Sequence, residues 1–350
     1  VGVPIPPWIW DGLDAAARAL LRGRLAKFLT VLCLVMLATW IPHYLRWPWW
    51  TDTDHFATTA LSWDRGILPY RDLLDFNFPA PVYLFWVLGK LFGWGHTGLV
   101  YALDALLVVG LAVILLRWSR RCFGRPLPGA IGLVVFLSYY LSLDYSMSAQ
   151  RDWQGPLFAV LGVLILEAWP GRAARIASAL TFAVAFAFRP HAILLVPAAL
   201  SAVDENARRS GDEPWGPAVR GVLEWGVVLT VGTFVAFCPL VFAGIADDLV
   251  RTFASSARYG ACFQSTMPRT SASEYLFRDL VNRETLCELA LLTAVAACFS
   301  RPLRRIGRTW LLALGFTLLY KPISPVVFEY HHVPFMLVTA VGISVIIAAI

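Results

Sequence analysis

The chain has 350 residues, of which 58% are hydrophobic and only 15% charged, and its mean hydropathy is +0.65. Soluble domains carry roughly 25% charged residues, so this composition excludes an ordinary soluble domain. The net charge of +6 does not indicate a nucleic-acid-binding protein, because the basic residues stand at the ends of apolar blocks. Since these blocks do not alternate as β-barrel strands do, we predict an all-α, polytopic transmembrane protein.

The amino-terminal quarter predicts one membrane span and a long outer loop. Asp11–Lys27 is rich in Ala, Leu and Arg, which predicts a basic helix lying on the cytoplasmic interface. A first span is expected at about 26–45, because an apolar helix of roughly 20 residues crosses the hydrocarbon. The stretch 46–96 is rich in Trp, Pro, Asp and Gly and predicts a first outer loop with juxtamembrane helices, since its apolar piece Ala80–Gly95 is short for a crossing.

The remaining apolar blocks bring the expected total to about ten spans. They lie near 97–117, 128–143, 153–169, 174–188, 190–203, 219–243, 285–300, 309–321 and 326–348. A second long outer loop is expected at 245–284. The short blocks at 174–188 and 190–203 leave one long kinked helix as an alternative, but Pro190 favours a break, because it disfavours helix at the residue before it.

The distribution of basic residues predicts the orientation of these spans. With the amino terminus inside and 80–95 left uncrossed, most of the 29 basic residues fall on the cytoplasmic side, as the positive-inside rule requires. A crossing at 80–95 would turn every later Arg cluster outward. We therefore expect a multi-pass integral membrane protein with a single domain over 1–350. Because the chain begins with Val and stops inside an apolar run at Ile350, the sequence leaves open that this domain is incomplete at its carboxyl end.

Polar residues gather at the expected outer ends of several spans. Ionisable groups at membrane depth are costly and indicate a functional site by default. For any one of them alone, a solvated helix cap, a local ion pair or an interfacial position is the plainer interpretation. The group comprises Asp52 and Asp54 after the first span, Arg151 and Asp152 at the start of the fourth, Arg189 in a short turn, and Lys321, Glu329, Tyr330, His331 and His332 around the last outer turn. Asp104, within a span, is instead expected to pair with a neighbouring helix.

The segment Asp52–Gly93 contains a dense series of motifs. An acidic pair is followed by Phe56-Ala57, by a Gly-x-x-Pro-Tyr-x-Asp turn at 66–72, by Pro-x-x-Tyr around Pro79–Tyr83 and by Leu-Phe-Gly at 91–93. This series resembles the first outer loop of the GT-C membrane glycosyltransferases, which include protein O-mannosyltransferases and aminoarabinose transferases acting on lipid A.

Three sparser motifs extend this resemblance over most of the chain. Gln150-Arg151-Asp152 resembles the second acidic site of the family, Phe188-Arg189-Pro190 its basic-Pro turn, and Tyr330-His331-His332-Val333-Pro334 its late His-aromatic-Pro element. The chain departs from the family in the first loop, where many members have Asp-Glu and this sequence has Asp-Thr-Asp-His. The catalytic carboxylate is therefore Asp52 or Asp54, and the spacing to Phe56 favours Asp52.

The resemblance implies a fold, a reaction and a set of site residues. It implies a GT-C-like glycosyltransferase that moves a sugar from a polyprenyl-phosphate donor to an acceptor hydroxyl on a glycan, lipid or protein, with inversion. The implied roles are catalysis by Asp52, Asp54 and Asp152, binding of the donor phosphate by Arg189, Arg151, Lys321, His331 and His332, and substrate binding by Tyr70, Asp72 and Tyr330. No cofactor is specified, and a divalent metal ion, Mg²⁺ or Mn²⁺, is an open alternative.

Two other classes of membrane protein compete with this interpretation. A transporter or flippase for a lipid-linked or small solute would line a translocation path with its charges and would often carry inverted repeats. A noncatalytic membrane subunit is the third alternative. The compact size and the lack of an appended soluble domain favour a bacterial inner-membrane protein whose active site faces outward, with membrane lipid and not nucleic acid as a partner.

Overall fold

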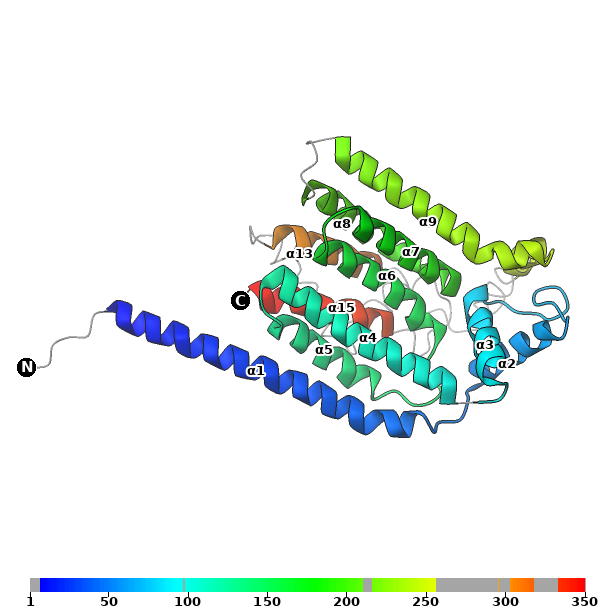
Figure 1. Cartoon of the computed structure of the whole chain (residues 1–350), viewed down its shortest axis with the longest axis horizontal. Helices are drawn as coiled ribbons and strands as arrows, with labels where there is room; N and C mark the ends of the chain where they lie inside the picture. The colour runs from blue at the N-terminus through cyan, green and yellow to red at the C-terminus, as the bar shows by residue number, and fades with distance from the viewer. Residues whose placement is uncertain are drawn as a thin grey trace, which may run out of the picture.

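A computed structural model describes residues 7–96, 98–209, 216–255, 295, 303–317 and 333–349. In these ranges every regular element is a helix, and the backbone shows only one isolated bridge, between Pro69 and Leu73. The elements are α1 (Pro7–Tyr44), α2 (Thr51–Asp64), α3 (Pro79–Phe92), α4 (Gly98–Phe123), α5 (Leu127–Tyr140), α6 (Arg151–Ala168), α7 (Arg172–Phe188), the 3-10 helix η1 (Pro190–Leu195), α8 (Val196–Arg209), α9 (Gly216–Phe242), α13 (Arg304–Thr317) and α15 (Val333–Ala349) (Figure 1).

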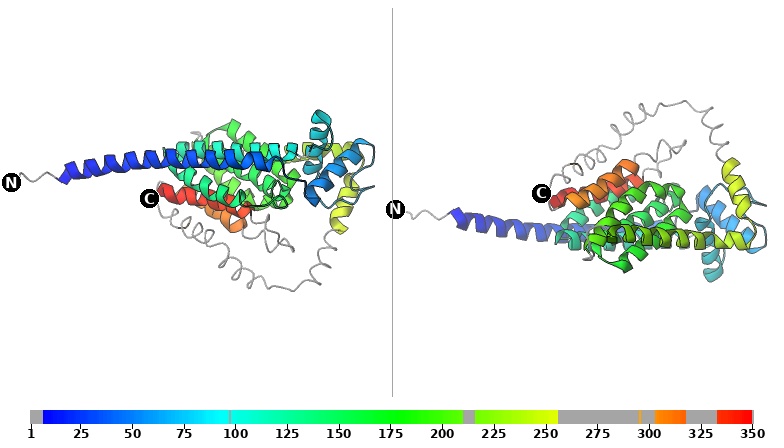
Figure 2. Two further views of the ribbon diagram at one scale, coloured as in Figure 1. Left: turned by 90° about the horizontal axis from the view of Figure 1, so that it is seen from below. Right: turned by 90° about the horizontal axis from the view of Figure 1, so that it is seen from above.

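The long helices form a bundle, and from α4 to α9 each runs opposite to the one before it. In Figure 1, α1 and α9 flank the bundle on opposite sides, and α2 and α3 lie across one of its ends. Figure 2 shows that α1 continues past the other end of the bundle toward the amino terminus. We call the end covered by α2 and α3 the capped end, and the opposite end, where α4 and α8 finish, the basic end.

Among the described residues, three helices are long and apolar enough to cross a membrane. They contain the candidate spans Gly23–Tyr44, Gly98–Phe123 and Val219–Phe242, and shorter apolar helices occupy Pro79–Phe92, Leu127–Tyr140 and Val333–Ala348. A span needs about 20 apolar residues, which these three segments provide. The all-α prediction is confirmed for the described residues, whereas the total of about ten spans and the GT-C-like architecture stay predictions.

Most helix positions agree with the apolar blocks of the sequence, with two corrections. The expected interfacial helix at Asp11–Lys27 is wrong as a separate element, because α1 runs without a break from Pro7 to Tyr44. The residues that join the two parts are mainly Ala, Leu, Arg and Lys, which are strong helix formers and give no stop signal. Residues 246–255 are helical, although the sequence predicted a loop there. The expected span at 285–300 lies outside the described residues, apart from position 295.

The predicted break at Arg189 is confirmed. Helix α7 ends at Phe188, Arg189 is extended with a φ of −153°, and η1 begins at Pro190. Pro190 has no amide hydrogen and its ring disfavours helical backbone at Arg189, so the chain turns there before α8 begins. This turn places Arg189 at the capped end.

Helix α6 forms the centre of the packing, and small residues let neighbouring helices approach one another. Nearly all its side chains are buried, including Trp153 and Leu157. At Gly132 of α5, an added Cβ would collide with the hydroxyl of Ser344 and the carbonyl of Ala340 on α15. Small residues at such crossings allow the close backbone contact that stabilises helix pairs in membranes.

We expect Gly132→Ala to destabilise the fold, because the added methyl group forces α5 and α15 apart. Overpacking of this kind costs about 1–3 kcal/mol. Gly110→Ala is the matched control, because a Cβ at this α4 position has no atom within 4 Å and Ala favours helix over Gly. Thermal unfolding in detergent should show a lower midpoint for Gly132→Ala only; equal midpoints would contradict the packing described.

Candidate functional site

Four charged residues from three separate elements meet at the capped end of the bundle. Asp52 lies in the first turn of α2, Arg151 and Asp152 open α6, and Arg189 follows the last residue of α7. The two carboxylates stand in first turns, where the positive end of the helix dipole stabilises negative charge. We call this set the carboxylate–guanidinium chain.

The charges in this set alternate along the chain of contacts. Arg151 Nη1 lies 3.5 Å from Asp52 Oδ2, and Arg151 Nε lies 3.8 Å from Asp152 Oδ2. Arg189 Nη2 is 2.6 Å from Asp152 Oδ1, the tightest contact of the set. The Asp152 side chain is fully buried, whereas that of Asp52 is 35% exposed. Asp152 is therefore held between two cations, and Asp52 is the carboxylate that a substrate can reach.

Packing fixes the two guanidinium groups. The Arg151 guanidinium carbon lies 5.2 Å from the centre of the Phe56 ring, a cation–π contact. An added Cβ at Gly155 would lie 2.9 Å from the Arg189 Cβ, so only glycine at this α6 position lets Arg189 come so close. The buried Nε and Nη1 atoms of Arg151 donate no hydrogen bond in the part of the chain that the structure describes. These N–H groups can donate to an anionic oxygen.

The two predicted carboxylates of α2, Asp52 and Asp54, differ in their contacts. Asp52 contacts Arg151, whereas Asp54 is exposed and makes no ion pair with any described residue. The geometry thus brings together Asp52, Asp152, Arg151 and Arg189, and it leaves Asp54 apart. The predicted site residues Lys321, Tyr330, His331 and His332 lie outside the described residues.

Tyr70 and Asp72 make contacts within the first outer loop. Tyr70 adopts a left-handed φ of 66° and donates its hydroxyl hydrogen bond to the Asn77 carbonyl at 2.8 Å. Asp72 Oδ2 accepts a hydrogen bond from the Leu68 amide at 2.8 Å. Between them, Arg71 pairs with Asp248 at 2.9 Å and joins the loop to the chain that follows α9. The predicted substrate-binding pair thus shapes this loop, and no hydrogen bond or ion pair between described residues joins it to the carboxylate–guanidinium chain.

The sequence interpretation missed a second pair of ionisable residues beside Asp52. His55 Nε2 lies 3.4 Å from Asp75 Oδ1, and the Asp75 side chain is fully buried whereas that of His55 is 40% exposed. Asp75 Oδ1 also accepts hydrogen bonds from the Asn77 backbone and side-chain nitrogens, at 2.8 and 2.6 Å. His55 follows Asp52 by three residues on α2, a spacing that places both on one helix face and could have indicated that His55 lies beside Asp52. No sequence signal joins His55 to Asp75.

The contact with Asp75 raises the pKa of His55 above its ordinary value of 6.5, against the opposing effect of burial. Asp52 also raises this pKa, and Arg151 lowers it, so both groups act on the imidazole. The His55–Asp75 pair therefore belongs electrostatically to the same site. In its protonated form this imidazole can donate a hydrogen bond to an anion.

A buried polar cluster lies directly below the site. Asp104 of α4 is fully buried and accepts hydrogen bonds from the hydroxyls of Tyr44 and Tyr140, each at 2.6 Å, and from Trp153 Nε1 at 2.9 Å. The prediction that Asp104 pairs with neighbouring helices is confirmed. Because Trp153 follows Asp152 on α6, this cluster fixes the first turn of that helix and with it the position of Asp152.

Residue types that bind metal ions do not form a cluster in the described ranges. No group of three or more His, Cys, Asp or Glu side chains lies together there. The two carboxylates of the carboxylate–guanidinium chain both face arginine instead. The cations that contact these two carboxylates are guanidinium groups.

Comparison with known proteins finds no relative of this chain. No protein-family model matches the chain, and no curated protein or solved structure is significantly similar to it. The fold and the site define a helical protein with segments that can cross a membrane and with a buried carboxylate–guanidinium chain at one end of the bundle. The resemblance of Asp52–Gly93 to the GT-C loop stays a prediction.

We expect the His55–Asp75 pair to stabilise the fold more at low pH. A raised folded-state pKa contributes stability that is fully present below the ordinary His value and is lost as the pH rises through the folded-state value. The difference in melting temperature between the wild type and His55→Gln should be larger at about pH 6 than at about pH 8.5. Lys90→Gln, which removes an exposed ion pair with Asp64, is the control and should show no such trend. A difference that grows with pH would contradict the pairing.

We expect Asp152 and Arg189 to be strongly coupled in stability. Removal of one partner from a buried ion pair leaves an uncompensated charge and costs about 3–5 kcal/mol. Arg189→Gln should therefore unfold at much lower denaturant, whereas Asp152→Asn/Arg189→Gln should be less destabilised than the sum of the two single variants. Additive losses in a double-mutant cycle would mean that the two side chains do not interact.

Proposed function

We propose that this chain is a GT-C-type membrane glycosyltransferase that moves a sugar from a polyprenyl-phosphate donor to an acceptor hydroxyl. The observation that supports this proposal most strongly is the carboxylate–guanidinium chain, which combines one accessible carboxylate with two arginines. Acid–base chemistry needs a reachable carboxylate, and a phosphate leaving group needs fixed cations. The motif resemblance of the first outer loop supports the same reaction.

The proposed orientation puts the capped end outside the membrane. The ends of α4 and α8 and the start of α13 carry Arg clusters, and all of them lie at the basic end. Under the positive-inside rule this end faces the cytoplasm, so the site faces outward. The protein is then a multi-pass protein of the bacterial inner membrane, and its partners are the polyprenyl-phosphate sugar, an acceptor glycan, lipid or protein, and membrane lipid.

In the proposed reaction Asp52 is the general base. Its carboxylate takes the proton of the acceptor hydroxyl as that oxygen attacks the anomeric carbon from the face opposite the donor phosphate. The bond between this carbon and the phosphate oxygen breaks, the configuration inverts, and polyprenyl phosphate leaves with the electron pair. A positioned general base typically contributes 10²–10⁴-fold to the rate.

The arginines stabilise the departing phosphate in this mechanism. Guanidinium groups bind phosphate oxygens through paired N–H donors. The Arg151 Nε and Nη1 atoms face Asp152 and Asp52 but donate no hydrogen bond to a described residue, so the proposed reaction assigns them to the phosphate. Asp152 positions Arg151 and Arg189, and these two guanidinium groups compensate the charge of its carboxylate. Lys321, His331 and His332 remain candidates for the same phosphate, and Tyr330 for the substrate. A divalent ion would have Asp52 as its accessible ligand, but the proposed steps need only the guanidinium groups.

The rival transporter interpretation predicts charged groups along a path through the bundle. The described side chains that this proposal uses gather at one end instead. Below them, Asp104 is enclosed by Tyr44, Tyr140 and Trp153, which fill the space with aromatic rings. This arrangement favours chemistry at the surface of the membrane over passage through it.

Deletion of the gene should make a polyprenyl-phosphate sugar accumulate, because its consumer is absent. Mass spectrometry of the lipid extract identifies the sugar, and this extract then serves as the donor for the purified protein. The wild type should release polyprenyl phosphate from it, and Asp52→Asn should be about 10²–10⁴-fold slower. The control Asp204→Asn removes a carboxylate paired with Arg208 at the basic end and should keep wild-type activity.

Equal rates for Asp52→Asn and the wild type would refute Asp52 as the base. No accumulation in the deletion strain, together with solute uptake into vesicles that contain the protein, would refute the transferase and support transport. Melting temperatures of each variant separate loss of activity from loss of fold.

A further inference from the structure

The basic end has a groove that the proposed reaction does not use. It lies between the middle of α1 and the turn that joins α4 to α5, and its volume is about 840 Å³. Ala26, Thr30 and Val31 form the α1 wall, and Pro126 and Leu127 form the opposite wall. The groove is therefore apolar over most of its length and starts where the candidate span Gly23–Tyr44 begins.

Two glycines keep this groove open. An added Cβ at Gly23 on α1 would have no atom within 4 Å, so this helix face meets no side chain there. Gly124 has a φ of +71°, a left-handed conformation that lets the chain turn directly after α4. The turn and the missing side chain together separate the two walls.

Basic side chains stand at the rim of the groove without acidic partners. Lys27 on α1 and Arg120 on α4 both line it, both are exposed, and neither forms an ion pair within the residues that the structure describes. The third basic residue, Arg125, donates hydrogen bonds to the carbonyls of Ile347 and Ala348 at 3.1 and 3.3 Å and so holds the end of α15. Lys27 and Arg120 thus line one apolar groove from two different helices.

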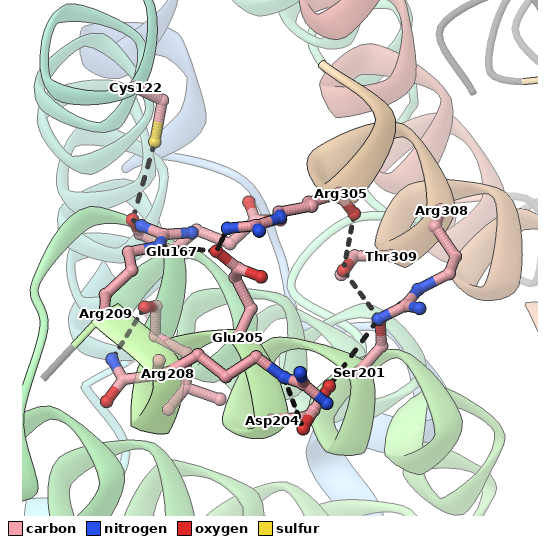
Figure 3. Close-up of polar contacts among 12 residues, drawn as sticks. Cys122, Glu167, Ser201, Asp204, Glu205, Arg208, Arg209, Arg305, Arg308 and Thr309 are labelled. Carbon is pink, nitrogen blue, oxygen red and sulfur yellow. Dashed lines mark hydrogen bonds and ion pairs between the residues drawn. The ribbon is translucent and has the colours of Figure 1, made fainter. Parts of the chain in front are cut away.

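Several other arginines of the basic end pair with carboxylates. Figure 3 shows Glu205 with Arg209 and Arg305, at 3.2 and 2.6 Å. In the same view Asp204 pairs with Arg208 at 3.1 Å and lies 3.9 Å from Arg308.

The same pattern continues on the next helices, where Glu224 of α9 pairs with Arg172 and Arg175 of α7. Lys27 and Arg120 have no carboxylate partner among the described residues. Arg24 and Arg117 on the same helices have none either, but only Lys27 and Arg120 line the groove.

We propose that this groove binds one anionic phospholipid of the cytoplasmic leaflet. Lys27 and Arg120 hold the phosphate of the headgroup, and the acyl chains lie along the apolar walls formed by Ala26, Val31 and Leu127. Basic groups near the membrane surface attract anionic lipids, and basic pockets between membrane helices bind their headgroups. A free phosphate ion would leave the apolar walls uncovered, so the occupant is a lipid. This inference does not depend on the proposed transferase activity.

Native mass spectrometry of the full chain in detergent tests this site, with phosphatidylglycerol and phosphatidylcholine as the two probes. The wild type should retain one phosphatidylglycerol at concentrations at which phosphatidylcholine does not bind. Lys27→Gln/Arg120→Gln should lose about tenfold or more in affinity, since each surface cation contributes about fivefold. The matched control Arg24→Gln/Arg117→Gln removes the same charge from the same two helices at positions that do not line the groove, and should bind as the wild type does.

Gly23→Trp tests the groove itself, because the indole ring occupies the part of it beside α1 and leaves every charge in place. This variant should lose phosphatidylglycerol binding while its melting temperature without lipid stays near that of the wild type. Equal binding of the two lipids, wild-type binding by Lys27→Gln/Arg120→Gln or by Gly23→Trp, or an equal loss in the control would each overturn the proposal.

Discussion

The site depends on one buried carboxylate, that of Asp152, which lies between two guanidinium groups. A carboxylate with no exposed surface is stable only if cations or hydrogen bonds compensate its charge. Arg189 provides the closest compensation, at 2.6 Å, and Arg151 lies on the other side. Because Arg151 also reaches Asp52, the position of the accessible carboxylate depends on the buried one.

The surrounding fold provides the constraints that keep this arrangement in place. Pro190 ends α7 and leaves Arg189 extended, and Gly155 lets Arg189 approach α6. Asp104 anchors the first turn of α6 through Trp153. None of these residues reacts in the proposed mechanism, yet each positions a group that does. Preorganised charge of this kind is the main source of transition-state stabilisation in enzymes.

Much of this structure could be predicted from the sequence, because long apolar blocks and a proline after a helix have local causes. The helices and the break at Arg189 follow from them. Pairings between distant segments have no such signal, so the sequence could name Asp152 and Arg189 but not their contact. His55 and Asp75 were missed for the same reason, since a loop folded by the left-handed Tyr70 brings them together. The continuity of α1 was missed because a change from basic to apolar composition does not break a helix.

In the proposed mechanism, the arginines of the carboxylate–guanidinium chain bind a lipid phosphate at the outer face of the membrane. Binding of polyprenyl phosphate, the product of the proposed reaction, by the purified protein tests it most directly. The wild type is predicted to bind this lipid, and Arg151→Gln, which keeps the Asp152–Arg189 pair, to bind it about tenfold or more weakly, as the loss of a charge-assisted hydrogen bond implies. Equal affinities of a folded Arg151→Gln and the wild type would contradict the claim.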